Sequence, residues 1–143
     1  MYNVKIRDYR IRGIGVADRS CAAIVDGGTI LMVLQTYKGE TFWTFPGGRI
    51  EPLETRVQCA IRETKEETGL DIEISGKVCE VFNARINGTY HCFLGTIVGG
   101  TEALGSDPEL SMDIQELADL QWFSMNELAD HPEVKRVLEY VKR

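Results

Sequence analysis

The chain has 143 residues, 43% of them hydrophobic and 27% charged, a composition typical of one globular domain rather than of a disordered or fibrous protein. Its 22 Asp and Glu residues outnumber its 16 Lys and Arg residues, which gives a net charge of −6. This balance disfavours nucleic acid as the main partner, because a surface that follows phosphates carries a basic excess. We therefore expect a single domain spanning residues 1–143.

The beginning of the chain lacks the continuous apolar stretch of a signal peptide. The longest apolar runs, Cys21–Val25 and Ile30–Leu34, are too short to span a bilayer, so we expect a cytoplasmic protein with no membrane partner. The cysteines form no CxxC pair and stand in apolar contexts, which favours small buried thiols over a disulfide or zinc framework. They are Cys21, Cys59, Cys79 and Cys92.

The first half of the chain predicts strands. Alternating residues over Tyr2–Arg12 predict an exposed strand. Two β-rich runs, Cys21–Val25 and Thr29–Thr36, are separated by Asp26-Gly27-Gly28, a hairpin turn signal. Thr41–Phe45 predicts a further short strand before the Pro-Gly-Gly sequence that follows it.

The period then changes to that of a helix, over Glu54–Thr68. One face is predicted to be buried because its residues follow the i, i+4, i+7, i+11 spacing. These residues are Val57, Ile61, Thr64 and Thr68, with Ala60 beside them. Gly69 stands where the C-terminal glycine of a helix belongs.

Mixed signals fill the second half of the chain. Strands are predicted at Asp71–Ile74, Lys77–Arg85, Thr89–Val98 and Leu120–Phe123, with Asn87-Gly88 as a hairpin turn. Helices are predicted at Ser124–Ala129, with Ser124 as N-cap, and at Pro132–Arg143. Because strands and helices are mixed without regular alternation, we expect an α+β fold with layers around a mixed sheet.

Three carboxylates, Glu63, Glu66 and Glu67, share one face of the expected helix, away from the predicted buried stripe. Like charges at these spacings repel one another, and a hard cation such as Mg²⁺ would compensate for the repulsion. Arg62 could pair with Glu66 and hold its rotamer. A solvated acidic face, balanced by Arg62 and Lys65, explains the cluster equally well.

The glycine pair Gly47-Gly48 precedes this helix. It either forms only a tight turn or brings bare backbone close to a ligand or metal, as glycine permits. Pro46 would stiffen the approach in both cases.

Together these residues match the signature G-x5-E-x7-R-E-U-x-E-E-x-G-U, where U is a bulky aliphatic residue. The matching positions are Gly48, Glu54, Arg62, Glu63, Glu66, Glu67, Gly69 and Leu70, and Thr64 departs from the pattern at the first U. The signature is that of the Nudix hydrolases, which this chain therefore resembles. The flanking segments Trp43–Gly48 and Trp122–Leu128 are also similar to the family's pattern.

The resemblance implies an α/β/α sandwich around a mixed β-sheet. It also implies a MutT-like pyrophosphatase that uses Mg²⁺, with Mn²⁺ as the other metal considered, to cleave a nucleoside diphosphate linked to another group. Such a reaction needs charge neutralisation and positioning more than a covalent nucleophile. No Ser/His/Asp constellation competes with the carboxylates, and we expect His91 and His131 to be structural.

Roles follow from the matched positions. Glu63, Glu66 and Glu67 resemble the metal-binding glutamates, one of which is also a candidate base toward the attacking water. Glu54 resembles the position that supports the metal or the loop, and Arg62 the one that orients a glutamate.

Two further metal ligands are expected from the resemblance. The Gly48 carbonyl is one candidate. The other is an acidic residue in a loop before the late strand, for which Glu116 is the first choice, ahead of Glu109 and Asp113. A solvated loop carboxylate is the common alternative.

Substrate choice is left open by the sequence. The tyrosine that marks dinucleoside polyphosphate hydrolases and the proline that marks ADP-ribose hydrolases are not evident, which leaves a nucleoside triphosphate or a similar small nucleotide. Four aromatic residues could stack a base, although aromatic residues in strands are more often core. They are Tyr37, Trp43, Phe82 and Tyr90. Of these, Trp43 and Tyr90 are the candidates for substrate binding.

Two other functions are compatible with the sequence. The first is a non-catalytic domain on the same scaffold that senses a nucleotide or ADP-ribose. The second is the processing of RNA ends guided by Arg7, Arg10, Arg12 and Arg19, for which a solvated strand edge is the simpler explanation. The exposed early strands also offer an edge for a homodimer.

Overall fold

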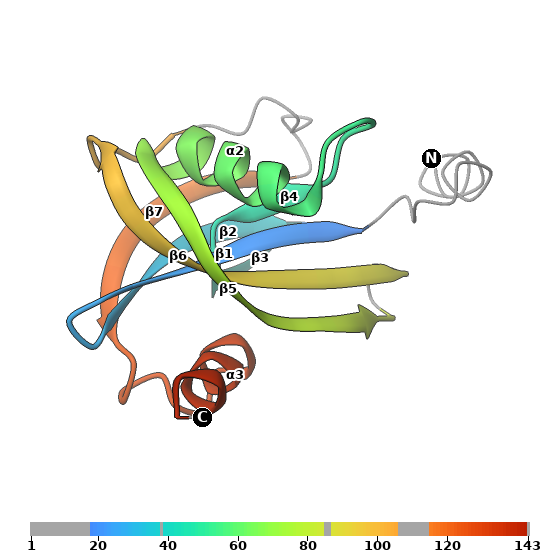
Figure 1. The fold of residues 1–143 in the computed structure, drawn as a ribbon. Helices are drawn as coiled ribbons and strands as arrows, with labels where there is room; N and C mark the ends of the chain where they lie inside the picture. Colours follow the sequence, from blue (N-terminus) through green and yellow to red (C-terminus); the bar gives the residue numbers. More distant parts are fainter. Residues whose placement is uncertain (1–17, 38, 85–86, 106–114, 143) are drawn as a thin grey trace.

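The computed structural model describes residues 18–37, 39–84, 87–105 and 115–142 (Figure 1). The strand expected at Tyr2–Arg12 lies outside these residues, as do the candidate ligands Glu109 and Asp113.

In the described part of the chain, one sheet of seven strands forms the centre of the structure. The strands are β1 (Arg19–Asp26), β2 (Thr29–Tyr37), β3 (Glu40–Thr44), β4 (Gly47–Arg49), β5 (Leu70–Asn83), β6 (Gly88–Gly100) and β7 (Gln115–Ser124). They follow the order β3-β2-β1-β6-β5, with β4 beside β1 and β7 beside β2. The pair β1–β6 is parallel and the other pairs are antiparallel, which confirms the mixed sheet.

Two helices cover the two faces of this sheet. α2 (Arg56–Thr68) lies on one face and α3 (Pro132–Val141) on the other, as Figure 1 shows. The expected α/β/α sandwich is therefore confirmed.

The predicted hairpin between β1 and β2 is also confirmed. Asp26 pairs with Thr29, and the two residues between them, Gly27 and Gly28, have φ angles of +58° and +82°. Both angles lie in the left-handed region, which a two-residue turn with the twist of the flanking strands requires. The sequence signal was strong because glycine adopts these angles without steric cost.

β5 differs from the prediction of two separate strands. Leu70–Asn83 is continuous and pairs with β6, with register shifts between Ile74 and Gly76 and between Lys77 and Cys79. The gap between the two predicted strands falls at Ser75-Gly76, but Gly76 has a tertiary role, since a Cβ there would collide with the Tyr140 hydroxyl of α3. The glycine makes room for the helix without ending the strand.

The helix expected at Ser124–Ala129 is not formed. This segment makes consecutive turns, in which Glu127 N–H donates to Ser124 O and Leu128 N–H donates to Met125 O. Met125 N–H donates to Gly28 O, which ties the start of the segment to the turn between β1 and β2. Pro132 biases the preceding residue toward extended backbone, so helical backbone cannot run on into α3.

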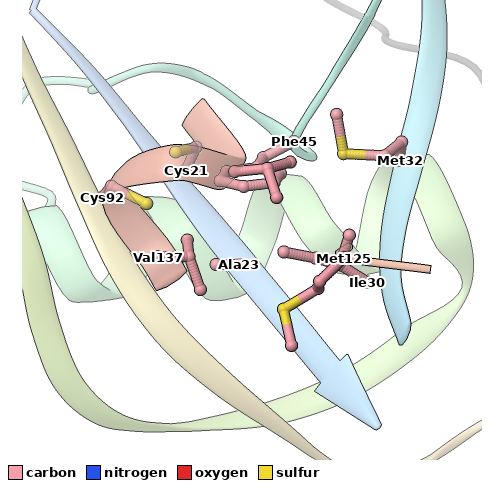
Figure 2. Close-up of a cluster of buried hydrophobic side chains, with 9 residues drawn as sticks. Cys21, Ala23, Ile30, Met32, Phe45, Cys92, Met125 and Val137 are labelled. Atoms are coloured by element: carbon pink, nitrogen blue, oxygen red, sulfur yellow. The ribbon is translucent and has the colours of Figure 1, made fainter. Parts of the chain in front are cut away.

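The hydrophobic core has one part on each face of the sheet. β1 contributes to both, because Cys21 and Ala23 face α3 whereas Ala22 and Ile24 face α2. Figure 2 shows the α3 side, where side chains from several strands meet the helix. The labelled residues are Cys21, Ala23, Ile30, Met32, Phe45, Cys92, Met125 and Val137.

The cysteines agree with the prediction of small, mostly buried thiols. None of the four, all within the described part of the chain, forms a disulfide. Cys21, Cys92 and Cys79 occupy neighbouring register positions on β1, β6 and β5. Across the described ranges, no helix is long and apolar enough to cross a membrane.

Candidate active site

The helix that carries the signature is α2, which we call the box helix. It has well-defined ends. At its start Thr55 Oγ1 accepts from Gln58 N–H at 3.0 Å, and Gln58 Oε1 accepts from Thr55 N–H at 2.9 Å, which forms a capping box. At its end Gly69 has a φ of +76° and its N–H donates to Lys65 O. The predicted C-terminal glycine is thus confirmed, and the helix begins two residues later than expected.

The buried face of α2 matches the predicted stripe only in part. Ala60, Thr64 and Thr68 are fully buried as predicted. Val57, also predicted to be buried, is 37% exposed, whereas Glu63 and Glu67 are 0% exposed. The full set of buried residues is Cys59, Ala60, Glu63, Thr64, Glu67 and Thr68. The prediction that the three glutamates lie away from the core is therefore wrong for Glu63 and Glu67, while Glu66 is half-buried.

The reason lies in the part of the sheet beneath α2. The helix packs on β1 and β4, and β4 offers backbone rather than hydrocarbon because it contains Gly47 and Gly48. Gly47 N–H donates to Glu67 Oε1 at 3.3 Å. A polar partner of this kind allows a carboxylate to be buried where a helical wheel expects aliphatic residues.

Gly47 and Gly48 form a strand and not only a turn. They pair with Cys21 and Ser20 of β1, and a Cβ on Gly47 would lie 2.5 Å from Cys21 Cβ. A Cβ on Gly48 would lie 2.5 Å from Glu63 Cδ. Both positions therefore require glycine because a side chain would collide there, with β1 at Gly47 and with the Glu63 carboxylate at Gly48.

Arg62 links four oxygen-bearing groups of the signature. Its Nε and Nη2 donate to the two oxygens of Glu54 at 2.6 and 3.0 Å, a bidentate pair. Nη1 donates to Glu63 Oε1 at 2.9 Å and to Glu66 Oε1 at 3.0 Å, and Nη2 also donates to Arg49 O at 3.2 Å. The guanidinium therefore holds the carboxylates in fixed positions, as expected for Arg62.

These ion pairs shift the pKa of both partners in the direction that favours their charged forms. Burial acts to raise the pKa of Glu54, but the bonds from Arg62 and from Glu51 N–H outweigh it and hold the pKa below its ordinary value of 4.5. The hydrogen bond to Glu54 in turn raises the pKa of Arg62. The pair is charged at neutral pH.

Cys59 is a residue of this site that the sequence did not single out. Its buried thiol lies 3.6 Å from Gly48 O and 3.4 Å from Arg49 O, where its one proton can be donated to either carbonyl of β4. A signal was present, because Cys59 stands four residues before Glu63 and so shares its helical face.

The donor set suits a hard divalent cation. Carboxylates of Glu63, Glu66 and Glu67 and the carbonyl of Gly48 are oxygen ligands of the type that Mg²⁺ prefers. Among the described residues, no three His, Cys, Asp or Glu side chains already stand in the arrangement of a metal site, and Arg62 bridges Glu63 and Glu66. The chemistry of the residues fits the ion, whereas their present geometry is that of an ion-pair network.

Glu116 is placed differently from the prediction. It lies within β7, opposite Thr36 of β2, and not in a loop before the late strand. That strand is longer than expected because β2 continues to Tyr37 and offers pairing partners along its whole length.

Trp43 and Tyr90 lie on the α3 side of the sheet, across from the box helix. The Trp43 ring meets Phe123 edge to face, with centroids 4.8 Å apart. The Tyr90 hydroxyl bonds to Glu133 and lies 2.9 Å from Cys21 Sγ. The structure thus gives both residues core contacts and does not bring them together with the glutamates.

The two histidines have structural contacts, as expected. His131 caps α3, where its Nδ1 accepts from Glu133 N–H at 3.2 Å, and its Nε2 lies 2.9 Å from Trp43 O. His91 is 1% exposed and lies on the α2 side of β6, next to Arg56.

Comparison with known proteins places the chain in a family. A family model described as the NUDIX domain matches residues 17–142. The "Putative 8-oxo-dGTP diphosphatase" of Bacillus subtilis is 32% identical over 97 residues, which cover 68% of this chain and only 60% of that protein. The asymmetrical bis(5'-nucleosyl)-tetraphosphatase of Rattus norvegicus is 30% identical over 91% of this chain and 90% of its own.

The fold is shared with solved structures as well. The E. coli ORF135 protein superposes with a TM-score of 0.65 over 86% of this chain and 89% of its own, at 22% identity. At this identity the likeness concerns the fold alone.

Proposed function

The chain belongs to the Nudix hydrolase family, and from that membership we propose that it is a divalent-metal-dependent pyrophosphohydrolase. Its substrate would be a nucleoside diphosphate linked to another group, such as a nucleoside triphosphate or a similar small nucleotide. The observation that carries the proposal is the burial of Glu63 and Glu67 against the glycine backbone of β4. Buried carboxylates held at fixed positions are costly unless they serve a ligand or a counter-charge.

In this proposal Glu63, Glu66, Glu67 and the Gly48 carbonyl hold Mg²⁺, or Mn²⁺ in its place. The ion, when bound, neutralises the charge of the diphosphate and makes water a better nucleophile. Glu116 remains the candidate for a further ligand.

The residues of the chain supply positioning. Arg62, itself held by two bonds to Glu54, orients Glu63 and Glu66. The N–H of Gly47 orients Glu67. One oxygen of this carboxylate set accepts the proton of the attacking water, a role that requires hydrogen-bond reach and fixed geometry.

The substrate class is supported by the relatives. Two proteins of 30% identity or more carry names that denote cleavage of nucleotide phosphoric anhydrides. Trp43 and Tyr90 stay as predicted contacts of the base. A cytoplasmic location and a homodimer likewise stay predictions from the sequence.

The test is a screen of nucleoside triphosphates, dinucleoside polyphosphates and ADP-ribose, scored for released phosphate or pyrophosphate. Each substrate is run with Mg²⁺, with Mn²⁺ and with a chelator. Glu66→Gln should abolish turnover, whereas Glu73→Gln, on an exposed position of β5, should not change it. If a nucleotide bound tightly without being cleaved under any condition, the protein would be a sensor on the same scaffold and the enzyme proposal would fail.

A further inference from the structure

The first turn of the box helix is fastened to the sheet by a buried histidine. Arg56, the first residue of α2, donates from Nε to His91 Nε2 at 3.0 Å. The carbonyl of Arg56 accepts from Ser20 Oγ at 2.6 Å. Ser20 and His91 are paired residues of the parallel strands β1 and β6, so both contacts reach the centre of the sheet.

The chemistry of the donor fixes the state of the imidazole. A guanidinium can only donate, so His91 Nε2 must be an acceptor, and the ring is neutral with its proton on Nδ1. Nδ1 points to the other side, 3.4 Å from Glu80 Oε1. A second proton on the ring would remove the acceptor and place two cations 3.0 Å apart.

Charges surround the imidazole on every element packed against it. Arg56 belongs to α2, Glu80 and Lys77 belong to β5 and form an ion pair, and Asp18 precedes β1. Burial, followed by the positive charge of Arg56, holds the pKa of His91 below its ordinary value of 6.5, although Glu80 and Asp18 oppose this effect. The neutral ring is thus the native state at physiological pH.

The contact also offsets an unfavourable position of Arg56. A cation in the first turn of a helix opposes the helix dipole, and α2 has no acidic residue there. A hydrogen bond from the guanidinium to a buried acceptor restores stability to that turn. Releasing it leaves the start of α2 held mainly by Ser20 and by the capping box.

We propose that His91 is a positioning residue for the box carboxylates. In its neutral form it anchors Arg56 and thereby the helix that carries Glu63, Glu66 and Glu67, and uptake of a proton at Nε2 releases this anchor. The effect on turnover rests on the proposed function, whereas the anchoring itself does not. Acidification should therefore loosen the first turn of α2.

The first test follows His91 directly. NMR titration of the histidine side chains should show one ring that titrates below its ordinary pKa, with its resonances assigned by comparison with His131→Asn. Arg56→Leu removes the neighbouring cation and should raise the pKa of His91. A titration of His91 at or above the ordinary value, or one that Arg56→Leu does not change, would overturn the anchoring, whether or not the protein is an enzyme.

The second test separates protonation from packing. His91→Gln keeps an acceptor for Arg56 but cannot take up a proton, so its kcat at neutral pH should stay within about twofold of the wild type. The acid limb of its kcat profile should move to lower pH. The protection of amides in the first turn of α2 against hydrogen exchange, relative to the intrinsic rate at each pH, should no longer fall between pH 7 and 5. His131→Asn, which keeps a good N-cap, should retain the wild-type profile.

The outcomes distinguish the two proposals. If no nucleotide is cleaved but the protection of α2 amides against exchange falls on acidification in the wild type and not in His91→Gln, the anchor stands and the proposed function fails. If His91→Gln shows the wild-type acid limb and the wild-type exchange, the anchor is refuted.

Discussion

Gly48→Ala would place a methyl group between β4 and the box helix. The added Cβ would lie 2.5 Å from Glu63 Cδ and 2.8 Å from Glu63 Oε1. Favourable contacts between two carbon atoms begin at about 3.5 Å, so the Glu63 carboxylate must move by about 1 Å. The end of a glutamate is flexible, but this one is fully buried and accepts a 2.9 Å bond from Arg62 Nη1.

The magnitude of each effect follows from this displacement. A strained or lost hydrogen bond to a charged group costs about 1.5–3 kcal/mol, so we expect the free energy of unfolding to fall by that amount at most. For a chain of this size the Tm would fall by roughly 3–12 °C. Activity should fall further, by about 100-fold, because a 1 Å misplacement of a positioned group has that effect on catalysis.

The assay compares kcat/KM and Tm for the wild type, Gly48→Ala and the matched control Gly99→Ala. A Cβ on Gly99, in β6, would lie 3.5 Å from Asp71 Oδ2, an ordinary contact. The control should keep both wild-type activity and Tm. Wild-type kcat/KM in Gly48→Ala would refute the argument that close approach of β4 to Glu63 sets the site, and an equal loss in the control would attribute the effect to glycine replacement in general.

Four other measurements test the network around α2 and the thiols. Glu67→Gln should lower kcat by about 10²–10⁴-fold while the denaturation midpoint changes little, because the amide oxygen can still accept from Gly47; unchanged activity would remove Glu67 from the site. Arg62→Lys should lower the free energy of unfolding by about 2 kcal/mol in urea titrations, since lysine cannot make the bidentate pair with Glu54. The pKa of Glu54 is lowered in the folded state, so its contribution to stability is present above pH 4.5 and is lost as the pH falls through the folded value; urea midpoints should therefore fall on acidification less steeply in Glu54→Gln. The hydrogen bond between Cys79 and Cys92, together with burial, raises the pKa of Cys79, so its alkylation at pH 8 should be slow until the chain is unfolded, and fast labelling of the native protein would contradict this.

The strands and the box helix could be predicted because local patterns specify them. The Gly27-Gly28 turn and the apolar run of β1 needed no knowledge of tertiary contacts. Ala60, Thr64 and Thr68 of α2 are buried as predicted, but the burial of Glu63 and Glu67 could not be predicted in this way. A helical wheel ranks faces by hydrophobicity, and here the partner is the glycine backbone of β4, which buries Glu63 in preference to Val57.

Other errors have the same origin in tertiary contacts. β4 has three residues, too few for any alternation, and exists because β1 supplies partners. The break expected in β5 at Gly76 reflects the packing of Tyr140 instead. Within the candidate site, the spacing of the signature selected the candidate residues. Their burial and their hydrogen bonds could be described only from the folded structure.

The pairing of β4 with β1 has a consequence for how the site can move. Flanking bonds from Ala22 N–H to Pro46 O, at 3.0 Å, and from Ile50 N–H to Asp18 O, at 3.2 Å, extend the attachment on both sides. β4 is therefore held as one rigid body with the parallel strands β1 and β6. It cannot open as a lid unless its backbone hydrogen bonds to β1 break. Within the described part of the site, the side chains that can adjust to the proposed nucleotide are those only partly buried, chiefly Arg62 and Glu66. Because Arg62 is bonded to Glu54, Glu63 and Glu66, such an adjustment requires these ion pairs to break and not the backbone to move.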